Sequence, residues 1–206
     1  FGSVIDSLQE SFRCIAYDHR GQGRSSGTSS DSIPIETLTE DAIALIESLN
    51  IGPVHFVGLS MGGFVGMRIA AKRPDLIQKL VLISTTSEAE PDENHRKYQL
   101  LNTITRFFGV RIVASSVLPI MFGSSFLKDV NRRHEKAKWR KELIGNRRDV
   151  TKAVQGVIER QAVTHELTKI SSPTLILHGT EDRAISIGRA KEMVQHIPQA
   201  TFVQTE

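Results

Sequence analysis

Residues 54–74, VHFVGLSMGGFVGMRIAAKRP, decide the fold of this chain. The first five of these residues combine β-branched and aromatic side chains, which is typical of a buried strand. Residues 61–73 have the apolar spacing of a helix, and Pro74 ends it. The sequence therefore predicts a strand that runs through a glycine-rich turn, GLSMGG at 58–63, straight into a helix.

Ser60 is the candidate nucleophile on this turn. A serine between a strand and a helix is held in a strained backbone conformation, and the residues two before and two after it must be small, a requirement that Gly58 and Gly62 meet. Its hydroxyl would project above the carboxyl edge of the sheet, where open α/β folds bind ligands. The N–H of Met61 would point to where an oxyanion forms. The alternative is a chance G-x-S-x-G in an ordinary turn, but the flanking strand and helix favour a nucleophile.

A second segment supplies the acid that such a serine requires. A serine hydroxyl is a weak nucleophile until a base takes its proton, and the base needs an orienting carboxylate. In TLILHGTEDRAI, residues 174–185, a Gly-Thr turn after a predicted strand presents two acids. Asp182 is the predicted acid and Glu181 the alternative. Without the serine motif, a solvated acidic loop would be the ordinary interpretation of this segment.

Short β-rich runs alternate with helical patterns, which favours an α/β fold with a mostly parallel sheet and helices on both faces. The near-continuous hydrophobicity of these runs is typical of strands buried on both faces. The five predicted strands are FRCIAY (12–17), VHFVG (54–58), KLVLIS (79–84), TLILH (174–178) and ATFVQ (200–204). The predicted helices cover about 37–49, 61–73 and 186–196, with Thr37 and Glu40 as a T-x-x-E capping box in the first.

Residues 86–168 break this alternation. They have helical apolar spacing and no convincing strand, so we expect a helical insertion between two strands. Part of this insertion is strongly basic. Its basic residues are Lys128, Arg132, Arg133, Lys136, Lys138, Arg140, Lys141, Arg147, Arg148 and Lys152, against the acids Asp129, Glu135, Glu142 and Asp149. The interleaved acids favour a solvated helix face over a nucleic-acid site. A third alternative is that one or two of the arginines hold an anionic substrate.

Three motifs together resemble the α/β-hydrolase superfamily. They are DHRGQGRS at 18–25, GLSMGG at 58–63 and GTED at 179–182. The resemblance covers nearly the whole chain and is specific for the superfamily, but it does not specify the substrate. Within the superfamily, the sequence is similar to 3-oxoadipate enol-lactonases, cofactor-free haloperoxidases and small esterases.

The resemblance implies a role for each candidate residue. Ser60 would be the nucleophile, Asp182 the acid of a catalytic triad and the Met61 N–H one oxyanion donor. It also implies a hydrolase core formed by residues 1–85 and 169–206, with residues 86–168 as a helical cap over the active site. The DHRGQGRS loop would shape one wall of the pocket, with His19 or Arg20 as lining residues. The alternative is a phosphate-binding glycine loop, but the spacing fits neither common pattern of such loops.

Two parts of the family pattern are expected outside residues 1–206. The catalytic histidine of the family commonly follows the last strand, beyond Glu206 here, and the second oxyanion donor follows an early strand, upstream of Phe1. That early strand is normally central, so we expect an incomplete core and poor folding of the 206 residues alone. None of the seven histidines in the chain follows the last predicted strand, and His178 is the best substitute among them.

Composition and cysteine content set the remaining expectations. With 39% apolar and 24% charged residues and a net charge of +3, the chain fits one soluble globular domain. The single cysteine, Cys14, excludes an internal disulfide and a cysteine-rich metal site, and favours a reducing, cytoplasmic location. No apolar stretch approaches the roughly 18 residues of a membrane span, so no membrane partner is expected.

We therefore expect an ester or lactone hydrolase that forms an acyl-enzyme on Ser60. Its substrate would be a small acyl compound, with an anionic one as an option, and no cofactor, metal or nucleic acid would be needed. The alternative is a non-catalytic ligand receptor or pseudoenzyme of the same fold. The sequence indicates neither the substrate nor the oligomeric state.

Overall fold

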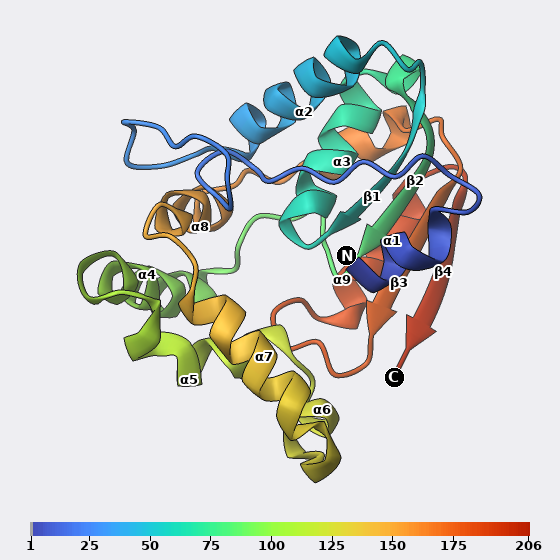
Figure 1. Cartoon of the computed structure of the whole chain (residues 1–206). Coiled ribbons are helices and arrows are strands. Elements are labelled where there is room, and N and C mark those ends of the chain that lie inside the picture. Colours follow the sequence, from blue (N-terminus) through green and yellow to red (C-terminus); the bar gives the residue numbers. More distant parts are fainter. Residues whose placement is uncertain (1) are drawn as a thin grey trace.

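The computed structural model describes residues 2–206 and has a four-stranded parallel sheet at its centre (Figure 1). The strands are β1 (Val54–Leu59), β2 (Ile77–Ile83), β3 (Thr174–Gly179) and β4 (Ala200–Thr205), and they lie side by side in that order. Each pair of neighbours is parallel and is joined by helical structure, as parallel pairing requires. The predicted α/β class with a mostly parallel sheet is confirmed.

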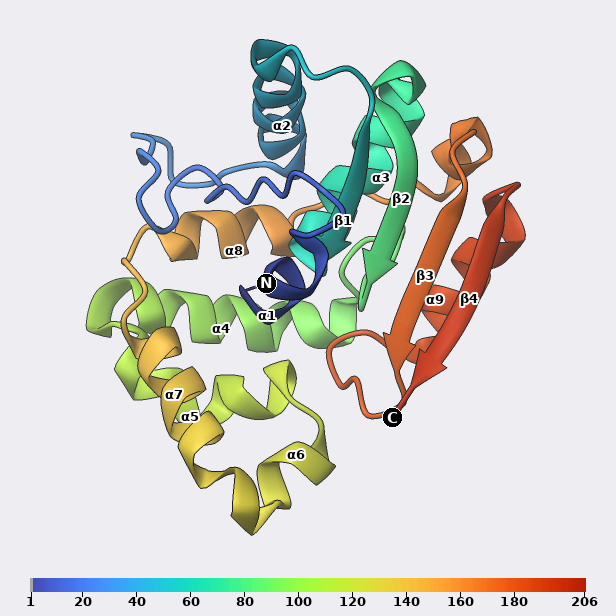
Figure 2. The same ribbon diagram turned by 45° about the vertical axis from the view of Figure 1, so that its right-hand side comes forward.

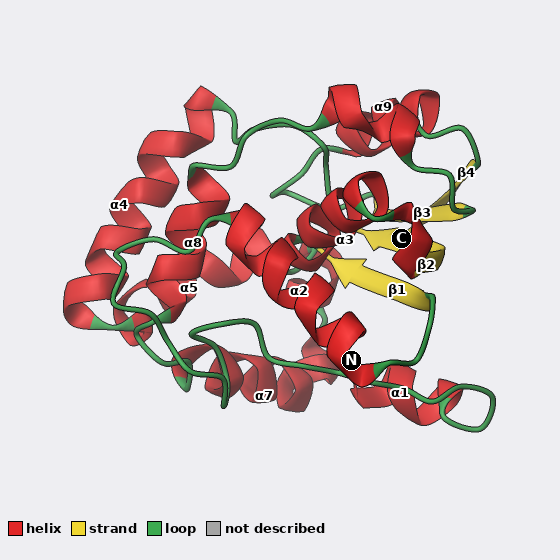
Figure 3. Ribbon diagram, turned by 90° about the horizontal axis from the view of Figure 1, so that it is seen from above, coloured by secondary structure: helices red, strands yellow, loops and turns green. Residues whose placement is uncertain are grey.

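Helices cover the two faces of the sheet unequally. Figure 3 shows α3 (Met61–Lys72) and α9 (Ile187–His196) on one side of the sheet and α1 (Gly2–Leu8) on the other. Helix α2 (Ile35–Leu49) packs against α3. The predicted capping box is wrong, because α2 begins two residues before Thr37 and uses Pro34 as its N-cap residue.

The core lies between α3, α2 and the buried face of the sheet. Its largest fully buried side chains include Phe64, Met67 and Ile69 of α3 and Leu80 and Leu82 of β2. Burial of a side chain of this size contributes about 1.5–3 kcal/mol. Helix α3 is therefore fixed along most of its length, and so is the turn from which it starts.

The prediction of a strand at 12–17 is wrong. These residues run as irregular chain, and Phe12, Ile15 and Tyr17 are 49%, 44% and 37% exposed. A strand requires a neighbour that completes its hydrogen bonds, and within residues 2–206 no strand lies beside the free edge of β1. Apolar side chains alone do not make a strand here.

The expectation that every strand is buried on both faces is also wrong. Along β1, Gly58 is buried and Phe56 half-buried toward α3, whereas His55, Val57 and Leu59 are exposed on the opposite face. The central strands β2 and β3 are better covered. The reason is that α1 and the irregular segment after it cover only part of that second face (Figure 3).

All the regular structure between β2 and β3 in the described residues is helical, as predicted for 86–168. Figures 1 and 2 show most of it at the carboxyl ends of the strands. The α-helices are α4 (Asp92–Phe108), α5 (Val110–Met121), α6 (Ser124–Lys128), α7 (Arg133–Ile144) and α8 (Val150–Ile158). The short 3-10 turns of this segment are η2 (Val130–Arg132) and η3 (Thr164–Lys169), and a further one, η1 (Pro74–Leu76), lies between α3 and β2.

The end of this helical segment belongs to the core. Leu167 and Ile170 are fully buried in the same cluster as α3 and β2. Helix α8 approaches residue 33 so closely that a Cβ at Gly156 would meet the Ile33 carbonyl oxygen at 1.8 Å. The segment between β2 and β3 is therefore anchored at its C-terminal side by α8 and η3. Within the described residues, no helix is both long enough and apolar enough to cross a lipid bilayer.

Candidate active site

Ser60 lies between β1 and α3 in a backbone conformation that is rare outside glycine. Its φ is 48° and its ψ is −110°. Its N–H donates to the Ile83 carbonyl at 2.9 Å, and its own carbonyl accepts from the N–H groups of Gly63 and Phe64 at 2.8 and 3.1 Å. The Thr85 hydroxyl donates to the same carbonyl at 3.0 Å. These four hydrogen bonds hold the strained turn in place, while the residue itself remains exposed.

Two glycines allow this turn, and only one of them was predicted. A Cβ at Gly58 would meet the Gly62 carbonyl oxygen at 2.3 Å, and a Cβ at Gly63 would meet Thr85 at 2.6 Å. At Gly62, a Cβ would meet no atom of the described residues within 4 Å. Among the described residues, the space after the serine is therefore restricted at Gly63, and the requirement for a small residue at Gly62 stays a prediction.

The Met61 N–H is available to a ligand. Met61 is the first residue of α3, and the first N–H groups of a helix have no partner within it. Its N–H has no hydrogen-bond acceptor among residues 2–206. The arrangement fits an oxyanion donor, with the positive end of the helix dipole behind it.

Asp182 lies in the turn after β3, and its carboxylate is fixed. Oδ1 accepts from the N–H groups of Ala184 and Ile185 at 2.9 and 3.0 Å. The other oxygen, Oδ2, lies 3.5 Å from Nε2 of His178. That histidine is fully buried, and its Nε2 also lies 2.9 Å from the Ile185 carbonyl oxygen. His178 therefore contacts two residues of the turn, Asp182 and Ile185.

The structure brings Ser60 and Asp182 to the same edge of the sheet. In the parallel register, Leu59 is aligned with Ile83 of β2, and Ile83 with Leu177 of β3. Ser60 and Asp182 both follow these aligned positions, so both lie at the carboxyl ends of strands that have only β2 between them. Neighbouring strands lie about 4.8 Å apart, which places β1 and β3 about 10 Å apart.

Glu181, the alternative acid, is bound elsewhere. Its carboxylate accepts from the hydroxyls of Ser124 and Ser125 at 2.8 and 2.7 Å and from the Ser125 N–H at 2.8 Å. These hydrogen bonds lower the pKa of Glu181. They join the loop after β3 to the start of α6, so Glu181 faces the helical segment. Both carboxylate oxygens of Glu181 accept hydrogen bonds from the start of α6, whereas Oδ2 of Asp182 accepts none from a backbone N–H or a hydroxyl of the described residues.

The family of the chain follows from comparison with known proteins. The family model described as the alpha/beta hydrolase fold matches residues 1–206. The chain belongs to the α/β-hydrolase fold family. This confirms the resemblance read from the three sequence motifs.

The relatives of this α/β-hydrolase are named for different enzyme activities. It is 25% identical over 200 residues to RutD of Agrobacterium fabrum, whose name proposes a carbamate hydrolase, with 95% of this chain and 75% of the relative covered. It is 26% identical over 199 residues to 3-oxoadipate enol-lactonase 2 of Acinetobacter baylyi, with 96% and 72% covered. The relatives are hydrolases, and their names differ in substrate.

Solved structures support the same fold. The enol-lactonase of Burkholderia xenovorans is 27% identical, with a TM-score of 0.88, and the match covers 98% of this chain and 75% of that one. A thermophilic esterase of Thermogutta terrifontis has the same identity and TM-score, with 99% and 75% covered. A non-heme bromoperoxidase of Mycobacterium tuberculosis, at 20% identity and a TM-score of 0.84, shares the fold over 98% and 75% of the two chains.

Three histidines of the hydrolase contact groups other than Ser60. His178 is engaged with Ile185, as described above. His55 lies on the exposed face of β1 with its ring 5.6 Å from that of Phe12. His19 packs its ring 5.0 Å from Tyr17, and burial lowers its pKa. Among the described residues, none of the histidines forms a hydrogen bond with the Ser60 hydroxyl.

Several basic residues of the hydrolase fasten its own loops. Arg20 forms an ion pair with Asp41 of α2, which directs its side chain toward that helix, and a pocket-lining role of His19 or Arg20 stays a prediction. Arg147 donates to the Ser25 carbonyl at 3.3 Å. Lys152 donates to the Thr28 carbonyl, so the start of α8 is fastened to the DHRGQGRS loop and the residues after it. That an arginine of the basic stretch holds an anionic substrate stays a prediction.

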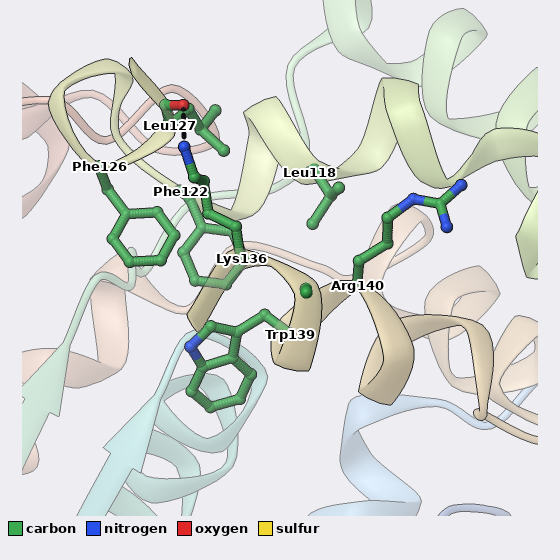
Figure 4. A pocket seen from close by; sticks show the side chains of 8 residues that line it. Leu118, Phe122, Phe126, Leu127, Lys136, Trp139 and Arg140 are labelled. Carbon is green, nitrogen blue, oxygen red and sulfur yellow. Dashed lines mark hydrogen bonds between the residues drawn. The ribbon is translucent and has the colours of Figure 1, made fainter. Parts of the chain in front are cut away.

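Two apolar cavities lie within the helical segment. One, of about 180 Å³, lies between α5, α6 and α7, and Phe122, Phe126 and Trp139 are among its lining residues (Figure 4). The other, of about 230 Å³, lies between α4, α5, α7 and α8. Ser60 and Asp182 line neither cavity. Residues 2–206 contain no group of three or more His, Cys, Asp or Glu side chains arranged to hold a metal ion.

Thr85 is the residue of the site that the sequence did not reveal. It fixes the Ser60 carbonyl and fills the space beside Gly63. It stands in the stretch Ser84-Thr85-Thr86-Ser87, directly after β2. A run of hydroxyl residues at the carboxyl end of β2, the strand beside the one that leads to Ser60, is the signal that could have indicated it.

Proposed function

We propose that this chain belongs to a serine hydrolase that cleaves an ester, lactone or related acyl bond through an acyl-enzyme on Ser60. The observation that carries the proposal is the strained, hydrogen-bonded backbone of Ser60 at the sheet edge that also bears Asp182. A strained non-glycine residue persists only where its surroundings hold it, and such residues cluster at functional sites.

The reaction would proceed in two halves. A base takes the proton of the Ser60 hydroxyl while its oxygen attacks the substrate carbonyl carbon, and the carbonyl oxygen becomes an oxyanion that accepts from the Met61 N–H. Collapse of this intermediate breaks the bond to the leaving group, which takes the proton from the base. Water then attacks the acyl-enzyme with help from the same base and releases the acid. Asp182 orients the base and stabilises its positive charge.

The base is proposed to be a histidine beyond residue 206. Among the described residues, no histidine forms a hydrogen bond with the hydroxyl of Ser60 in the elbow, the turn formed by residues 58–63, and His178, His55 and His19 contact other groups. The relatives extend beyond the matched region, since the chain covers about three quarters of their length. Asp182 Oδ2 is the oxygen that such a histidine would contact.

The substrate is proposed to be a small acyl compound. The names of the relatives include an enol-lactone, an ester and a carbamate, and all three contain a carbonyl carbon bonded to a heteroatom leaving group. We also propose that residues 86–168 act as a cap. Their helices lie at the carboxyl ends of the strands, and Glu181 fastens α6 to the loop that carries Asp182.

Hydrolysis of p-nitrophenyl acetate by the full-length protein tests this proposal. We expect Ser60→Ala to reduce kcat at least about 10³-fold, because the nucleophile is lost while the rest of the site remains. Ser48→Ala, at an exposed position on α2, is the matched control and should retain the wild-type rate. Equal rates for the wild type and Ser60→Ala would exclude the enzyme and favour a non-catalytic protein of the same fold.

A further inference from the structure

A buried ion pair between Arg160 and Glu90 lies next to helix α3, and the reaction described above does not use it. Arg160 follows α8, and Glu90 precedes α4. The Arg160 Nη1 lies 2.7 Å from the Glu90 carboxylate, and their side chains are only 2% and 6% exposed. The ion pair therefore joins the two points at which the chain enters and leaves the helical segment.

Arg160 also connects these two points to helix α3. Its Nε donates to the Glu88 carbonyl at 3.0 Å, and Nη1 also donates to the Val157 carbonyl at 2.8 Å. Its guanidinium carbon lies 4.4 Å from the centre of the Phe64 ring. The Phe64 N–H is one of the donors that hold the Ser60 carbonyl, so a single side chain contacts the elbow's helix and both connections.

The connection after β2, residues 84–90, is itself part of the elbow's support. Its Thr85 hydroxyl donates to the Ser60 carbonyl at 3.0 Å. Its Ser87 carbonyl accepts from the Val163 N–H at 2.7 Å. Arg189 of α9 pairs with Glu88 at 2.8 Å from the other side. Residues 84–90 thus have Thr85 at one end and the Arg160 ion pair at the other.

Stability alone is a poor explanation for such a pair. Removing two charges from water costs several kcal/mol per ion, and apolar residues of similar volume often give equal or greater stability in the same place. Burial lowers the pKa of Arg160, and the hydrogen bond to Glu90 opposes that shift. The forked guanidinium, however, joins three acceptors in a fixed geometry, which apolar side chains cannot reproduce.

We infer that Arg160 is a positioning residue for Ser60: through Glu90 and residues 84–90 it fixes Thr85, and through Phe64 it fixes the start of α3. The inference rests on the proposed role of Ser60 as nucleophile, and it adds that Arg160 fixes the position of Ser60. A nucleophile displaced by about 1 Å loses about 100-fold in rate, so small movements of this support are expected to alter turnover.

The test compares two variants of the full-length protein. Arg160→Met removes one charge, whereas the double variant Arg160→Met with Glu90→Leu removes both and leaves no unpaired buried charge. Arg106→Met is the matched control, because Arg106 pairs with Asp31 at the exposed surface. For each protein, Tm, the kcat and KM for p-nitrophenyl acetate, and the hydrogen exchange of amides 58–64 are measured.

We expect Arg160→Met to lower both Tm and kcat. The double variant should recover Tm, yet its kcat should stay about 10- to 100-fold below wild type with KM changed less than about threefold. Amides 58–64 should exchange faster in both variants and remain unchanged in Arg106→Met. Recovery of kcat together with Tm in the double variant, or unchanged exchange at 58–64, would overturn the inference. If the wild type is inactive, only the proposed function fails, because the exchange measurement still decides the positioning role.

Discussion

Ser60 and Ser84 follow neighbouring strands and both have left-handed backbone angles, with φ values of 48° and 46°. Each such angle in a non-glycine residue costs about 1–3 kcal/mol and needs support from its surroundings. At Ser60, the support is a carbonyl held by three donors and an amide bonded to β2. Ser60 is therefore distinguished from the other serines of the chain by its backbone support and not by its residue type.

Glycine substitutions test this support directly. Gly58→Ala should destabilise the protein by about 3 kcal/mol, because its Cβ would meet backbone that cannot move without breaking the turn. Gly62→Ala should stay within about 1 kcal/mol of wild type, since helix propensity favours alanine and the space is open. Urea unfolding of the two variants measures both values. Equal destabilisation would show that the described packing around the elbow is wrong.

Substitutions of the two neighbouring acids, Asp182 and Glu181, should differ in their effect on kcat. Asp182→Asn keeps an oxygen for the two backbone N–H groups but removes the charge that stabilises a protonated base, so kcat should fall about 10⁴-fold. Glu181→Gln keeps one acceptor oxygen for the start of α6, and its NH2 group can donate to a serine hydroxyl, so kcat should stay within about tenfold of wild type. Steady-state kinetics with an activated ester decide the assignment. A larger loss in Glu181→Gln than in Asp182→Asn would reverse it.

Among the helices and strands, the sequence predicted those that their own residues specify. Helix 61–73 and the four strands of the sheet were found, since apolar runs and Pro74 specify them without reference to distant parts of the chain. The strand expected at 12–17 does not form, because a strand needs a neighbouring strand to pair with, and the sequence of the segment itself does not show whether one is present. The same limit applies to Arg160 and Thr85, whose roles depend on contacts between distant residues.

The contact between Glu181 and helix α6 should depend on pH. Its hydrogen bonds lower the pKa of Glu181 below the ordinary 4.5, so the stabilisation is complete above that pH and is lost as the pH falls through the folded-state pKa. The single tryptophan, Trp139, lies 5.9 Å from Phe122, which precedes α6, and can report the change. Its fluorescence should therefore change below pH 4.5.

Two variants identify the group responsible for that change. Glu181→Ala should lack the acid transition and should already have altered Trp139 emission at neutral pH. Glu135→Ala, on the same helix as Trp139 and exposed, should keep the transition. An acid transition that persists unchanged in Glu181→Ala would contradict the described contact.

In the whole molecule, the candidate site residues lie at one edge of a sheet whose second face is only partly covered. The elbow and Asp182 follow the carboxyl ends of β1 and β3. Figure 2 shows most of the helical segment at the same end of the sheet. The exposed Val57 and Leu59 lie on the less covered face, away from α3. Family membership accounts for the arrangement of the core, whereas the names of the relatives differ in the bond that they cleave. The fold alone therefore does not specify the substrate.

Reaction of the full-length protein with a fluorophosphonate, followed by peptide mapping, tests the central claim most directly. The reagent bonds covalently to an activated serine oxygen with loss of fluoride, so no knowledge of the natural substrate is needed. We predict a single phosphonate adduct on Ser60 that forms much more slowly in Asp182→Asn. An unmodified Ser60, or an adduct on another serine, would contradict the account.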